Sequence, residues 1–584
     1  MKLVSAGALA PGTPNYIFWY QPLKKRFPDL EYFDYARELG RKTRQQMNAE
    51  YLERMSRERV EFLLEVVSRG ILYPSTLSKR LPQLDLAVHF FNDDEWQFDI
   101  FSRFICQYYH VVTTNNPQRV QEYAAFGKPA IFVQYACNHD LWRRLDAPKQ
   151  FDVTFIGQPH SGRHRAIAHL RGKGISVRVF GAGWDRHPEM ADIWGGYLSA
   201  DDVVRVMNES RICLNFLTAS TGDRMAIKAR IFEINGCGSF QLCSAFDEVG
   251  RYYEIGKEIQ VFHDMDDLVE KICYYLAHED EREAIARAGY ERTLREHTWD
   301  ARYDHMFREI ERLRPQLPVI PQPIISQKRV AVLYLAPRGR LAPATVASLN
   351  AQTLPNLEVA VVSDRAVQGA ESLTPRWRRM SLADLGTTDL DCDLVAFIED
   401  GEEWEPEKLQ FQAFALEQDA AKGIECNLAQ WGVFRRPGEP EFLSYVLRWL
   451  RDNHGREDLV PASVLPSALM VTADLFARER EALIGMLTRR DRTFAEGHFR
   501  DRAGYAHIEL GVSLVRVPER RLWEVIAAVS RRERCLWINS ALRYRSARYI
   551  PDLLRRLRWG RAWTLWRTYR LRQAGRQLEA EEGS

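Results

Sequence analysis

The sequence lacks most of the features that mark secreted, membrane-spanning or zinc-binding proteins. Its nine cysteines are scattered along 584 residues, and no two of them form a Cys-x-x-Cys pair. This spacing offers neither a disulfide framework nor a zinc ribbon, and it predicts a reducing compartment. No segment reaches the ~20 uncharged apolar residues of a membrane-spanning helix. The opening stretch MKLVSAGALAPGTPNY has too short an apolar core for a signal peptide, so we predict a cytoplasmic protein.

The net charge of the whole chain is also close to zero, but positive and negative residues are unevenly distributed along it. The whole chain carries a formal charge of +2. Residues 531–576 contain 14 arginines against Glu533 and Asp552, a net charge of +12, which leaves −10 for the remainder. A basic tail on an acidic body indicates an interaction with an anionic partner or with the body itself.

The length and the patterning predict three globular regions and a tail. A chain of 584 residues is too long for one hydrophobic core. Four prolines in the segment RPQLPVIPQPIISQ indicate a stiff linker. The predicted units are a first domain at 1–148, a second domain at 149–313, the linker at 314–327, a third domain at 328–525 and a basic helical tail at 526–584.

Strands and helices alternate through all three regions, which predicts an α/β fold. In the second region the strand patterns DVTFIG, SVRVFG, ICLNF and SFQLC are separated by helical patterns, as in a doubly wound parallel sheet. The first region contains the strand patterns LDLAVHFF, HVVTTN and PAIFVQYA, and a long helical pattern over residues 41–70. Ligands of such sheets bind outside the carboxyl ends of the strands.

Glycines follow several of these strands and predict anion-binding turns, because free backbone amides there face a ligand. The full Gly-x-Gly-x-x-Gly fingerprint is absent, since position 186 is Arg. The candidate residues of these turns are Gly157, Arg163, Arg165, Gly181, Gly183, Gly236 and Gly238.

Glu233 lies inside the apolar run ARIFEI, just ahead of the last of these turns. A buried carboxylate is costly unless something pairs with it. At the mouth of a doubly wound sheet it suits the two hydroxyls of a ribose. The alternative is an ion pair within the helix, with Lys228 or Arg230.

Residues 150–310 resemble the carboxyl-terminal domain of CgeB-like glycosyltransferases, relatives of a spore maturation protein with the two-domain GT-B fold. The resemblance rests on the order and spacing of VRVFGAGW, LSADDVVRVMNESRICLNF, KARIFEINGCGSFQL and EREAIARAGYERTLREHTWDARYDHMF. HFFNDDEW and YAAFGKPAIFVQYACNHDLWR resemble the amino-terminal domain of that family more weakly.

The resemblance implies two Rossmann-like domains with a nucleotide-diphosphate sugar between them. It implies that Glu233 holds the donor ribose and that Arg230 lies near the donor diphosphate, with Arg163 or Arg165. Asn215, at the end of ICLNF, joins the predicted donor-binding set. Many related enzymes carry a second glutamate eight positions earlier, where this chain has Met225.

In GT-B folds the catalytic base tends to come from the amino-terminal domain, so the resemblance implies a base in the first domain, where a strand ends in the acidic loop of HFFNDDEW. A base must reach the acceptor hydroxyl. Asp94, Asp93 and His89 are the candidates, in that order. The alternative is that the aspartates only cap the following helix.

The third region resembles family 2 glycosyltransferases of GT-A fold through ATVASLNAQTLPNLEVAVVSD and DLVAFIEDGEEWEPEKLQFQ. In that family an Asp-x-Asp holds a divalent metal against the donor. Here the segment is Glu399-Asp400-Gly401-Glu402-Glu403, and Gly401 falls at a ligand position although its side chain has no oxygen. We therefore predict a degenerate domain, with a divalent metal required only if this domain is active.

The basic tail has three interpretations. A set of apolar residues falls roughly along one helical face, with arginines around it: Leu553, Leu554, Leu557, Trp563, Trp566 and Tyr569. Such a helix can lie in an anionic membrane interface. It can equally pack on the acidic body, and nucleic acid is not an expected partner because no supporting fold is recognisable.

These observations predict a glycosyltransferase that moves a sugar from a nucleotide-diphosphate sugar to a glycan, lipid-linked or protein hydroxyl. Its GT-B site is expected to work without metal or other cofactor. Two alternatives stay open: a bifunctional enzyme with both sites active, and a glycan-binding scaffold whose nucleotide sites are relics.

Overall fold

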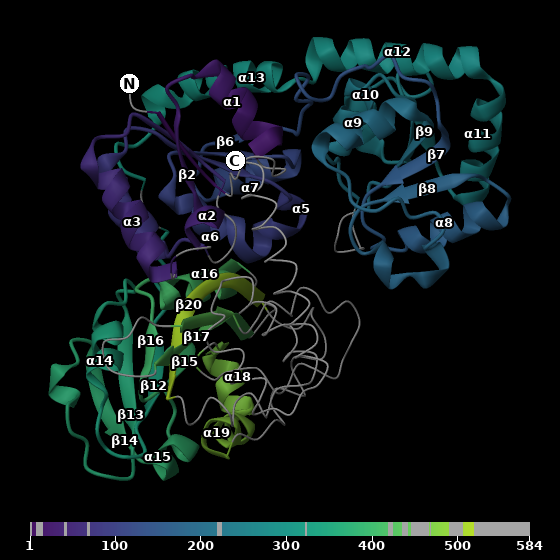
Figure 1. Cartoon of the computed structure of the whole chain (residues 1–584). Coiled ribbons are helices and arrows are strands. Elements are labelled where there is room, and N and C mark those ends of the chain that lie inside the picture. The colour runs from purple at the N-terminus through teal and green to yellow at the C-terminus, as the bar shows by residue number, and fades with distance from the viewer. Residues whose placement is uncertain are drawn as a thin grey trace, which may run out of the picture.

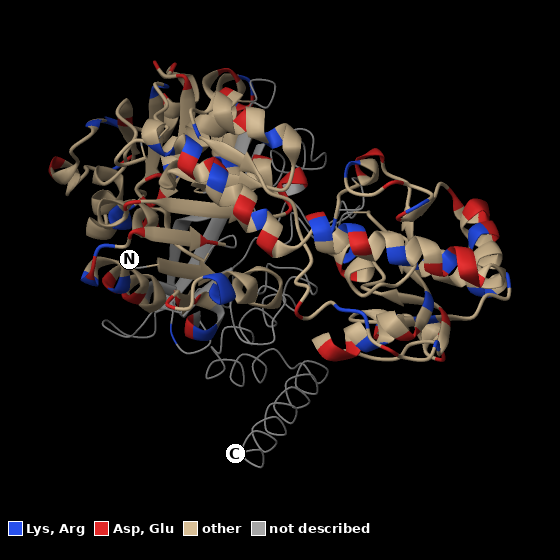
Figure 2. Ribbon diagram, turned by 90° about the horizontal axis from the view of Figure 1, so that it is seen from above, with Lys and Arg blue, Asp and Glu red and all other residues tan. Residues whose placement is uncertain are grey.

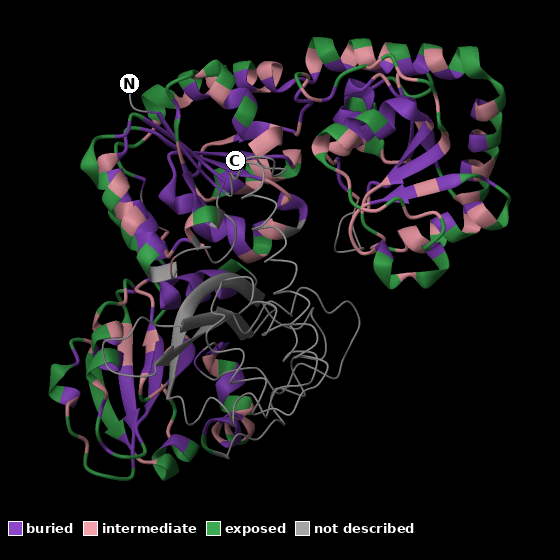
Figure 3. Cartoon of the chain, in the orientation of Figure 1, coloured by how far each residue is buried: buried purple, intermediate pink, exposed green. Residues whose placement is uncertain are grey.

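A computed structural model of the chain shows three α/β units, each built on its own sheet (Figure 1). The structure describes residues 3–7, 16–39, 42, 44–66, 71–218, 225–321, 324–418, 424–434, 442–445, 467, 469–489 and 506–518. The predicted tail at 526–584 lies outside these residues. The strands at the centre of each sheet are buried, and the helices expose their outer faces (Figure 3).

The first sheet has six parallel strands in the order β2-β1-β3-β4-β5-β6. The strands are β1 (Leu3–Gly7), β2 (Glu31–Asp34), β3 (Phe62–Glu65), β4 (Ala87–Phe91), β5 (Val111–Thr114) and β6 (Ala130–Phe132). The principal helices around it are α1 (Gln21–Arg26), α2 (Tyr35–Leu39), α3 (Arg44–Arg57), α4 (Pro74–Arg80) and α7 (Pro117–Ala125). The α/β prediction is confirmed for this part of the chain.

The predicted single helix over residues 41–70 is wrong. Helix α3 ends at Arg57, and Phe62–Glu65 form β3 between β1 and β4. All four residues of β3 are buried. A short run that is apolar on both faces has no period of its own, so it is indistinguishable in sequence from the end of a buried helix.

The second sheet has five parallel strands in the order β11-β10-β9-β7-β8; the doubly wound pattern and four of the strands were predicted, and β11 was not. They are β7 (Phe151–Ile156), β8 (Val177–Phe180), β9 (Ser210–Asn215), β10 (Gln241–Ser244) and β11 (Gln260–Phe262). The helices are α8 (Arg163–Gly172), α9 (Ala200–Glu209), α10 (Arg230–Gly236), α11 (Met265–Ala277) and α12 (Glu279–Glu296). Ser199 caps α9 by accepting a hydrogen bond from the amide of Asp202.

The chain crosses between the first two domains twice, and the two crossings touch. The backbone amide of Cys137 donates to the carbonyl of His297, and that of Trp299 donates to the carbonyl of Cys137. Helix α13 (Trp299–Leu313) then packs back on the first domain, where Trp299 and Tyr303 join its buried core. The second domain is therefore joined to the first through two adjacent crossings and the packing of α13.

The third sheet combines parallel and antiparallel strands. Its order is β14-β13-β12-β15-β19-β17-β20-β16, with β18 paired to β17. The strands β12 (Val330–Leu335), β13 (Leu357–Val362), β14 (Arg376–Met380) and β15 (Leu394–Glu399) run parallel, and β19 (Leu469–Thr472) runs antiparallel to β15. The remaining strands are β16 (Glu402–Trp404), β17 (Ile424–Phe434), β18 (Phe442–Tyr445) and β20 (Ala506–Pro518). Its helices include α14 (Pro343–Asn350), α15 (Leu382–Thr387), α16 (Lys408–Gln418), α18 (Ala473–Arg478) and α19 (Arg480–Arg489). The GT-A-like assignment of this unit stays a prediction.

Helix α16 of the third domain packs against the first domain (Figure 1). The Phe414 ring lies 5.8 Å from that of Phe104 and 5.4 Å from that of Phe126, centroid to centroid. Phe411 also contacts Phe104, at 5.7 Å. The backbone amide of Ile324, in the linker, donates to the side chain of Gln107. The first and third domains therefore share one hydrophobic core cluster.

Basic and acidic residues are mixed along the helices that face the viewer in Figure 2. Among the helices of the described residues, none is both long and apolar enough to cross a membrane. The basic tail, and with it the predicted membrane contact, lies outside the part of the chain that the structure describes.

Candidate active site

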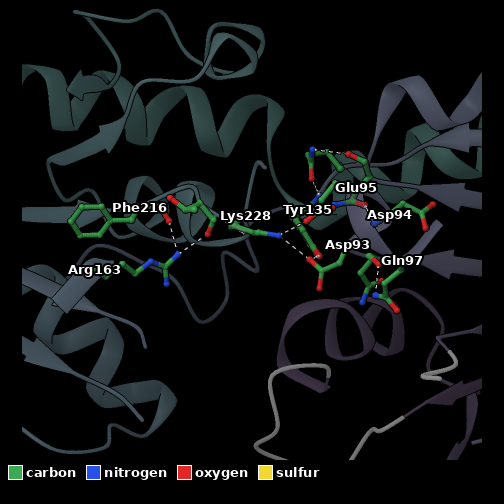
Figure 4. Close-up of polar contacts among 12 residues, drawn as sticks. Asp93, Asp94, Glu95, Gln97, Tyr135, Arg163, Phe216 and Lys228 are labelled. Carbon is green, nitrogen blue, oxygen red and sulfur yellow. Dashed lines mark hydrogen bonds and ion pairs between the residues drawn. The ribbon is translucent and has the colours of Figure 1, made fainter. Parts of the chain in front are cut away.

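The candidate site lies where the acidic loop after β4 of the first domain meets the residues that lead into α10 of the second (Figure 4). The loop continues into α5 (Asp94–Gln97), which begins directly after Asp93. Both segments follow strands of parallel sheets, which is the edge where such folds bind ligands. The first domain contributes carboxylates here and the second domain contributes cations.

Lys228 bridges the two domains. Its Nζ lies 2.9 Å from Oδ1 of Asp93 and 2.6 Å from Oε1 of Glu95. Burial alone would lower the pKa of Lys228, but the charges of Asp93 and Glu95 outweigh it and raise this pKa. Burial raises the pKa of Glu95, because Lys228 is shared with Asp93 and offsets only part of the desolvation.

Asp93 adopts an uncommon backbone conformation. Its φ of 56° and ψ of 32° lie in the left-handed region, which non-glycine residues seldom occupy. Its Oδ1 accepts a hydrogen bond from the hydroxyl of Tyr135, which follows β6, and its side chain is 36% exposed. Such strain persists only where surrounding contacts hold it, and it is frequent at functional sites.

Asp94 points away from the cleft into the first domain. Its Oδ1 accepts from Ser102 at 2.6 Å and its Oδ2 from Tyr123 at 2.8 Å. The residue is fully buried, and burial raises the pKa of Asp94 to about 6 although these hydrogen bonds oppose the shift. This placement favours a structural role over the catalytic role that was predicted first for Asp94.

His89 lies inside β4, also within the first domain. Its ring stacks on Phe91 at 3.9 Å and meets Tyr109 edge-on at 4.8 Å. Burial and the charge of Arg80 hold the pKa of His89 well below its ordinary value. Of the three predicted bases, the structure brings only Asp93 into contact with the second domain.

Glu233 lies in the middle of α10 and is only 1% exposed. Its Oε2 lies 3.0 Å from Nη1 of Arg230, one helical turn earlier. Its Oε1 has no hydrogen-bonding partner among the residues that the structure describes. Burial raises the pKa of Glu233, and Arg230 compensates in part. Of the two intrahelical partners considered from the sequence, Arg230 makes the ion pair and Lys228 does not.

Arg163 occupies the start of α8, next to the end of β9. Its Nη2 donates to the carbonyls of Phe216 and Thr218, at 2.8 and 3.0 Å (Figure 4). Burial lowers the pKa of Arg163 to about 10. Its Nε has no partner among the described residues. Arg165, two residues on, is exposed and lies against Gly162.

The turns after β7 and β8 pack directly on each other. Gly181 has a φ of 120°, and a Cβ atom at this position would lie 2.7 Å from the carbonyl oxygen of Gly157. That same oxygen accepts a hydrogen bond from the Trp184 indole. Gly183, which precedes Trp184, has a φ of 91°. Position 181 therefore requires glycine, because the two backbone segments approach each other closely there.

Three residues of the predicted donor set lie away from this surface. Asn215 is buried beneath α10, where its side chain donates to Gln241. A Cβ on Gly236 would lie 2.3 Å from Sγ of Cys137, and Gly238 faces Arg144. Gly236 ends α10, and the carboxyl end of a helix carries partial negative charge. Their geometry supports packing against the domain crossing and does not favour a phosphate contact.

The acidic turn of the third domain, residues 399–403, forms hydrogen bonds with other groups of the same domain. Oδ1 of Asp400 accepts hydrogen bonds from the Tyr334 hydroxyl at 2.6 Å and from the amide of Ala342 at 2.7 Å. Glu402 is buried and accepts from the amide of Glu399, and burial raises the pKa of Glu402 to about 8. No group of three or more His, Cys, Asp or Glu residues suited to a metal occurs within the described ranges.

The second domain is similar in sequence to known proteins. A family model described as glycosyl transferase-like matches residues 163–308. Spore protein CgeB of Bacillus subtilis (strain 168) is 25% identical over 187 residues, which cover 29% of this chain and 57% of that protein. The chain thus aligns with little more than half the length of this curated relative. The segment that matches the glycosyl transferase-like model contains Arg163, Lys228, Arg230 and Glu233.

Two solved structures are similar at low sequence identity. Anabaena Alr3699/HepE, crystallised in complex with UDP, is 11% identical, covers 54% of this chain and 100% of its own, and gives a TM-score of 0.40. A glycosyltransferase from Rickettsia africae ESF-5 is 11% identical, covers 54% of this chain and 98% of its own, and gives a TM-score of 0.38.

Sequence reasoning missed the residues that join the two domains. Lys228 was considered only as a partner of Glu233, and neither Glu95 nor Tyr135 was singled out. Lys228 and Asp93 are 135 positions apart, and no local pattern links them. The one usable signal was the concentration of three acidic residues directly after a buried strand, in NDDEW.

Proposed function

We propose that this protein is a glycosyltransferase that transfers a sugar from a nucleotide-diphosphate sugar to an acceptor hydroxyl of a glycan, a lipid carrier or a protein. The donor would bind to the second domain, at the start of α8 and along α10. The acceptor would bind to the first domain, beyond the carboxyl ends of its strands. Support comes from the glycosyl transferase-like match over residues 163–308 and from the two parallel sheets.

The buried carboxylate of Glu233 is the observation that carries this proposal. An ionised carboxylate accepts hydrogen bonds at both oxygens, and leaving one of them buried without a donor is unfavourable. Oε2 is paired with Arg230, whereas Oε1 has no partner among the described residues. The hydroxyls of a donor ribose would supply the missing hydrogen bonds, which is why the protein tolerates the buried charge.

Arginine side chains would balance the charge of the donor diphosphate. Arg163 is fixed at the start of α8 by its hydrogen bonds to Phe216 and Thr218, and Arg230 lies at the start of α10. Together with the exposed Arg165 they offer fixed positive charge where the nucleotide leaves. In this proposal the transfer needs no metal and no other cofactor.

Asp93 is the proposed catalytic base. It must take a proton from the acceptor hydroxyl at hydrogen-bonding distance. Asp93 is partly exposed and faces the second domain, whereas Asp94 and His89 are buried within the first. We do not extend the proposal to the third domain, since no group of three or more side chains suited to a metal occurs within the described residues.

A thermal-shift panel tests the proposal on the full chain. UDP-, GDP-, dTDP-, ADP- and CMP-sugars are added with and without Mn²⁺, to the native protein, to Glu233→Gln and to a control, Glu270→Gln. Glu270 is an exposed residue of α11 in the same domain. A ligand that binds only the native state raises Tm by mass action.

We expect one nucleotide class to raise the Tm of the native protein and of Glu270→Gln, independently of Mn²⁺, and to leave Glu233→Gln unchanged. Equal shifts in Glu233→Gln would remove the assigned role of the carboxylate. A well-folded native protein that responds to none of the donors would instead support the non-catalytic scaffold.

A further inference from the structure

The ion pairs of Lys228 with Asp93 and Glu95 join a loop of the first domain to a helix of the second. Lys228 is fixed to the helix that carries Glu233, because the amide of Ile231 donates to the Lys228 carbonyl at 3.1 Å. On the other side, the amide of Gln97 donates to the Asp93 carbonyl at 3.0 Å, so the acidic loop is part of α5. The ammonium group therefore connects the starts of two helices that belong to different domains.

The ion pairs of Lys228 are partly buried and lie near a further carboxylate, so the positive charge of Lys228 is needed to balance the acidic groups around it. The side chains of Lys228 and Glu95 are 25% and 9% exposed, so solvent screens their interaction only in part. Burial raises the pKa of Glu248, and the charge of Glu95 adds to this shift while Arg251 opposes it, which places a further acidic group near the pair. Without Lys228, Glu95 of the first domain would face Glu248 of the second with no bridging cation, and their repulsion would weaken this contact between the domains.

We propose that Lys228 is the positioning residue of this site: it closes the cleft by bridging Asp93 and Glu95, and so brings the Asp93 carboxylate to the sugar donor held by α10. The bridge holds Asp93 next to the start of the helix that carries Glu233, and loss of the bridge should separate the two. This inference rests on the proposed transferase function for its kinetic consequence, while the bridge itself is independent of that function.

The test uses small-angle X-ray scattering and steady-state kinetics on full-length variants. Lys228→Met removes the charge and keeps the length of the side chain. Glu95→Gln breaks half of the bridge from the opposite domain without touching Asp93 or α10, and it serves if Lys228→Met does not fold. Lys228→Arg retains the charge. Lys257→Met is the matched control, because Lys257 is exposed and pairs with Glu254 inside the second domain.

Lys228→Met should increase the radius of gyration and lower kcat about a hundredfold, the loss expected when a reacting group is misplaced by about 1 Å. The Kd of the nucleotide-sugar should stay unchanged, since Glu233 and the arginines are intact. Lys228→Arg should restore closure and most of kcat, and Lys257→Met should behave as the native protein. The double variant Lys228→Met/Glu95→Gln should be no worse than Lys228→Met, because both changes break one contact.

Native scattering and native kcat in Lys228→Met would overturn the proposal, as would additive losses in the double variant. Loss of donor binding with an unchanged radius of gyration would make Lys228 a donor ligand and would also overturn it. If no donor binds to the native protein, the transferase function fails, but the scattering comparison still decides whether the bridge closes the cleft.

Discussion

The first domain meets the second and the third domains through different kinds of contact. With the second domain it forms the ion pairs of Lys228 with Asp93 and Glu95, besides the apolar packing of Trp299 and Tyr303. With the third domain it shares a hydrophobic core cluster that includes Phe104 and Phe414, with Phe126 packed against it. A charged bridge can exchange its partners for water or ligand, whereas separating apolar surfaces exposes them to water. The apolar contacts of α13 and of α16 therefore fix both outer domains to the first, and the Lys228 bridge is the contact that can change its partners without exposing an apolar surface.

Glu233 of the second domain and Asp400 of the third domain differ in how their carboxylate oxygens are hydrogen-bonded. Glu233 keeps one buried oxygen without a partner among the described residues, while Asp400 uses one oxygen for both Tyr334 and Ala342. A carboxylate that its own fold has satisfied gains little from a ligand. One that is left unsatisfied gains a full hydrogen bond.

The largest effect is expected from Phe414→Ala at the attachment of the third domain. Removing a buried aromatic ring that contacts Phe104 and Phe126 should lower the free energy of unfolding by about 3 kcal/mol. Urea denaturation measures this loss, and Leu294→Ala, at a half-exposed position of α12, is the control. A fragment that ends before α16 should expose the same surface and aggregate. If Phe414→Ala unfolds as the native protein does, the contrast between the two attachments is lost.

Donor affinity should separate the two acidic residues. Glu233→Ala should weaken binding of the responding nucleotide-sugar about a hundredfold, the loss of roughly two hydrogen bonds to a charged acceptor. Asp400→Ala should leave the Kd unchanged in isothermal titration. A weakened Kd in Asp400→Ala would show that the third domain takes part in donor binding and would revive the bifunctional alternative.

A smaller effect is expected from Asp400→Ala on stability. The variant loses the hydrogen bonds from Tyr334 and from the amide that precedes α14, at a site partly open to water. The free energy of unfolding should fall by about 1 kcal/mol. We expect Mn²⁺ to leave the Tm of the native protein and of Asp400→Ala equally unchanged. Stabilisation of the native protein alone by Mn²⁺ would contradict the structural role of Asp400.

The smallest effect concerns pH and Glu233. Burial raises the pKa of Glu233 above its ordinary value of 4.5, so the folded protein holds this proton more tightly than the unfolded chain. Stability contributed by the protonated group is then present below pH 4.5 and is lost as the pH rises. Without donor, Glu233→Gln should therefore be more stable than the native protein at pH 7, by roughly 1 kcal/mol or less, with no gain at pH 4. A pH-independent difference would show that Glu233 is satisfied in the free protein.

The sequence by itself determined the alternation of strands and helices, because burial on a sheet and on a helix imposes different periods on the chain. It also determined which acidic residues deserved a test: Glu233 in an apolar run and the aspartates after LDLAVHFF. These features depend on residues that are neighbours in the chain.

Tertiary structure decided the rest. It made Phe62–Glu65 a central strand rather than the end of a helix, since burial on both faces is a property of the sheet and not of the segment. It turned Asp94 inward to Ser102 and Tyr123 and left Asp93 at the cleft, although the two are adjacent in sequence. It also gave Lys228 its partners, 133 and 135 positions away. The attraction between two charges depends on their distance in space, and the fold sets that distance when it places the two domains.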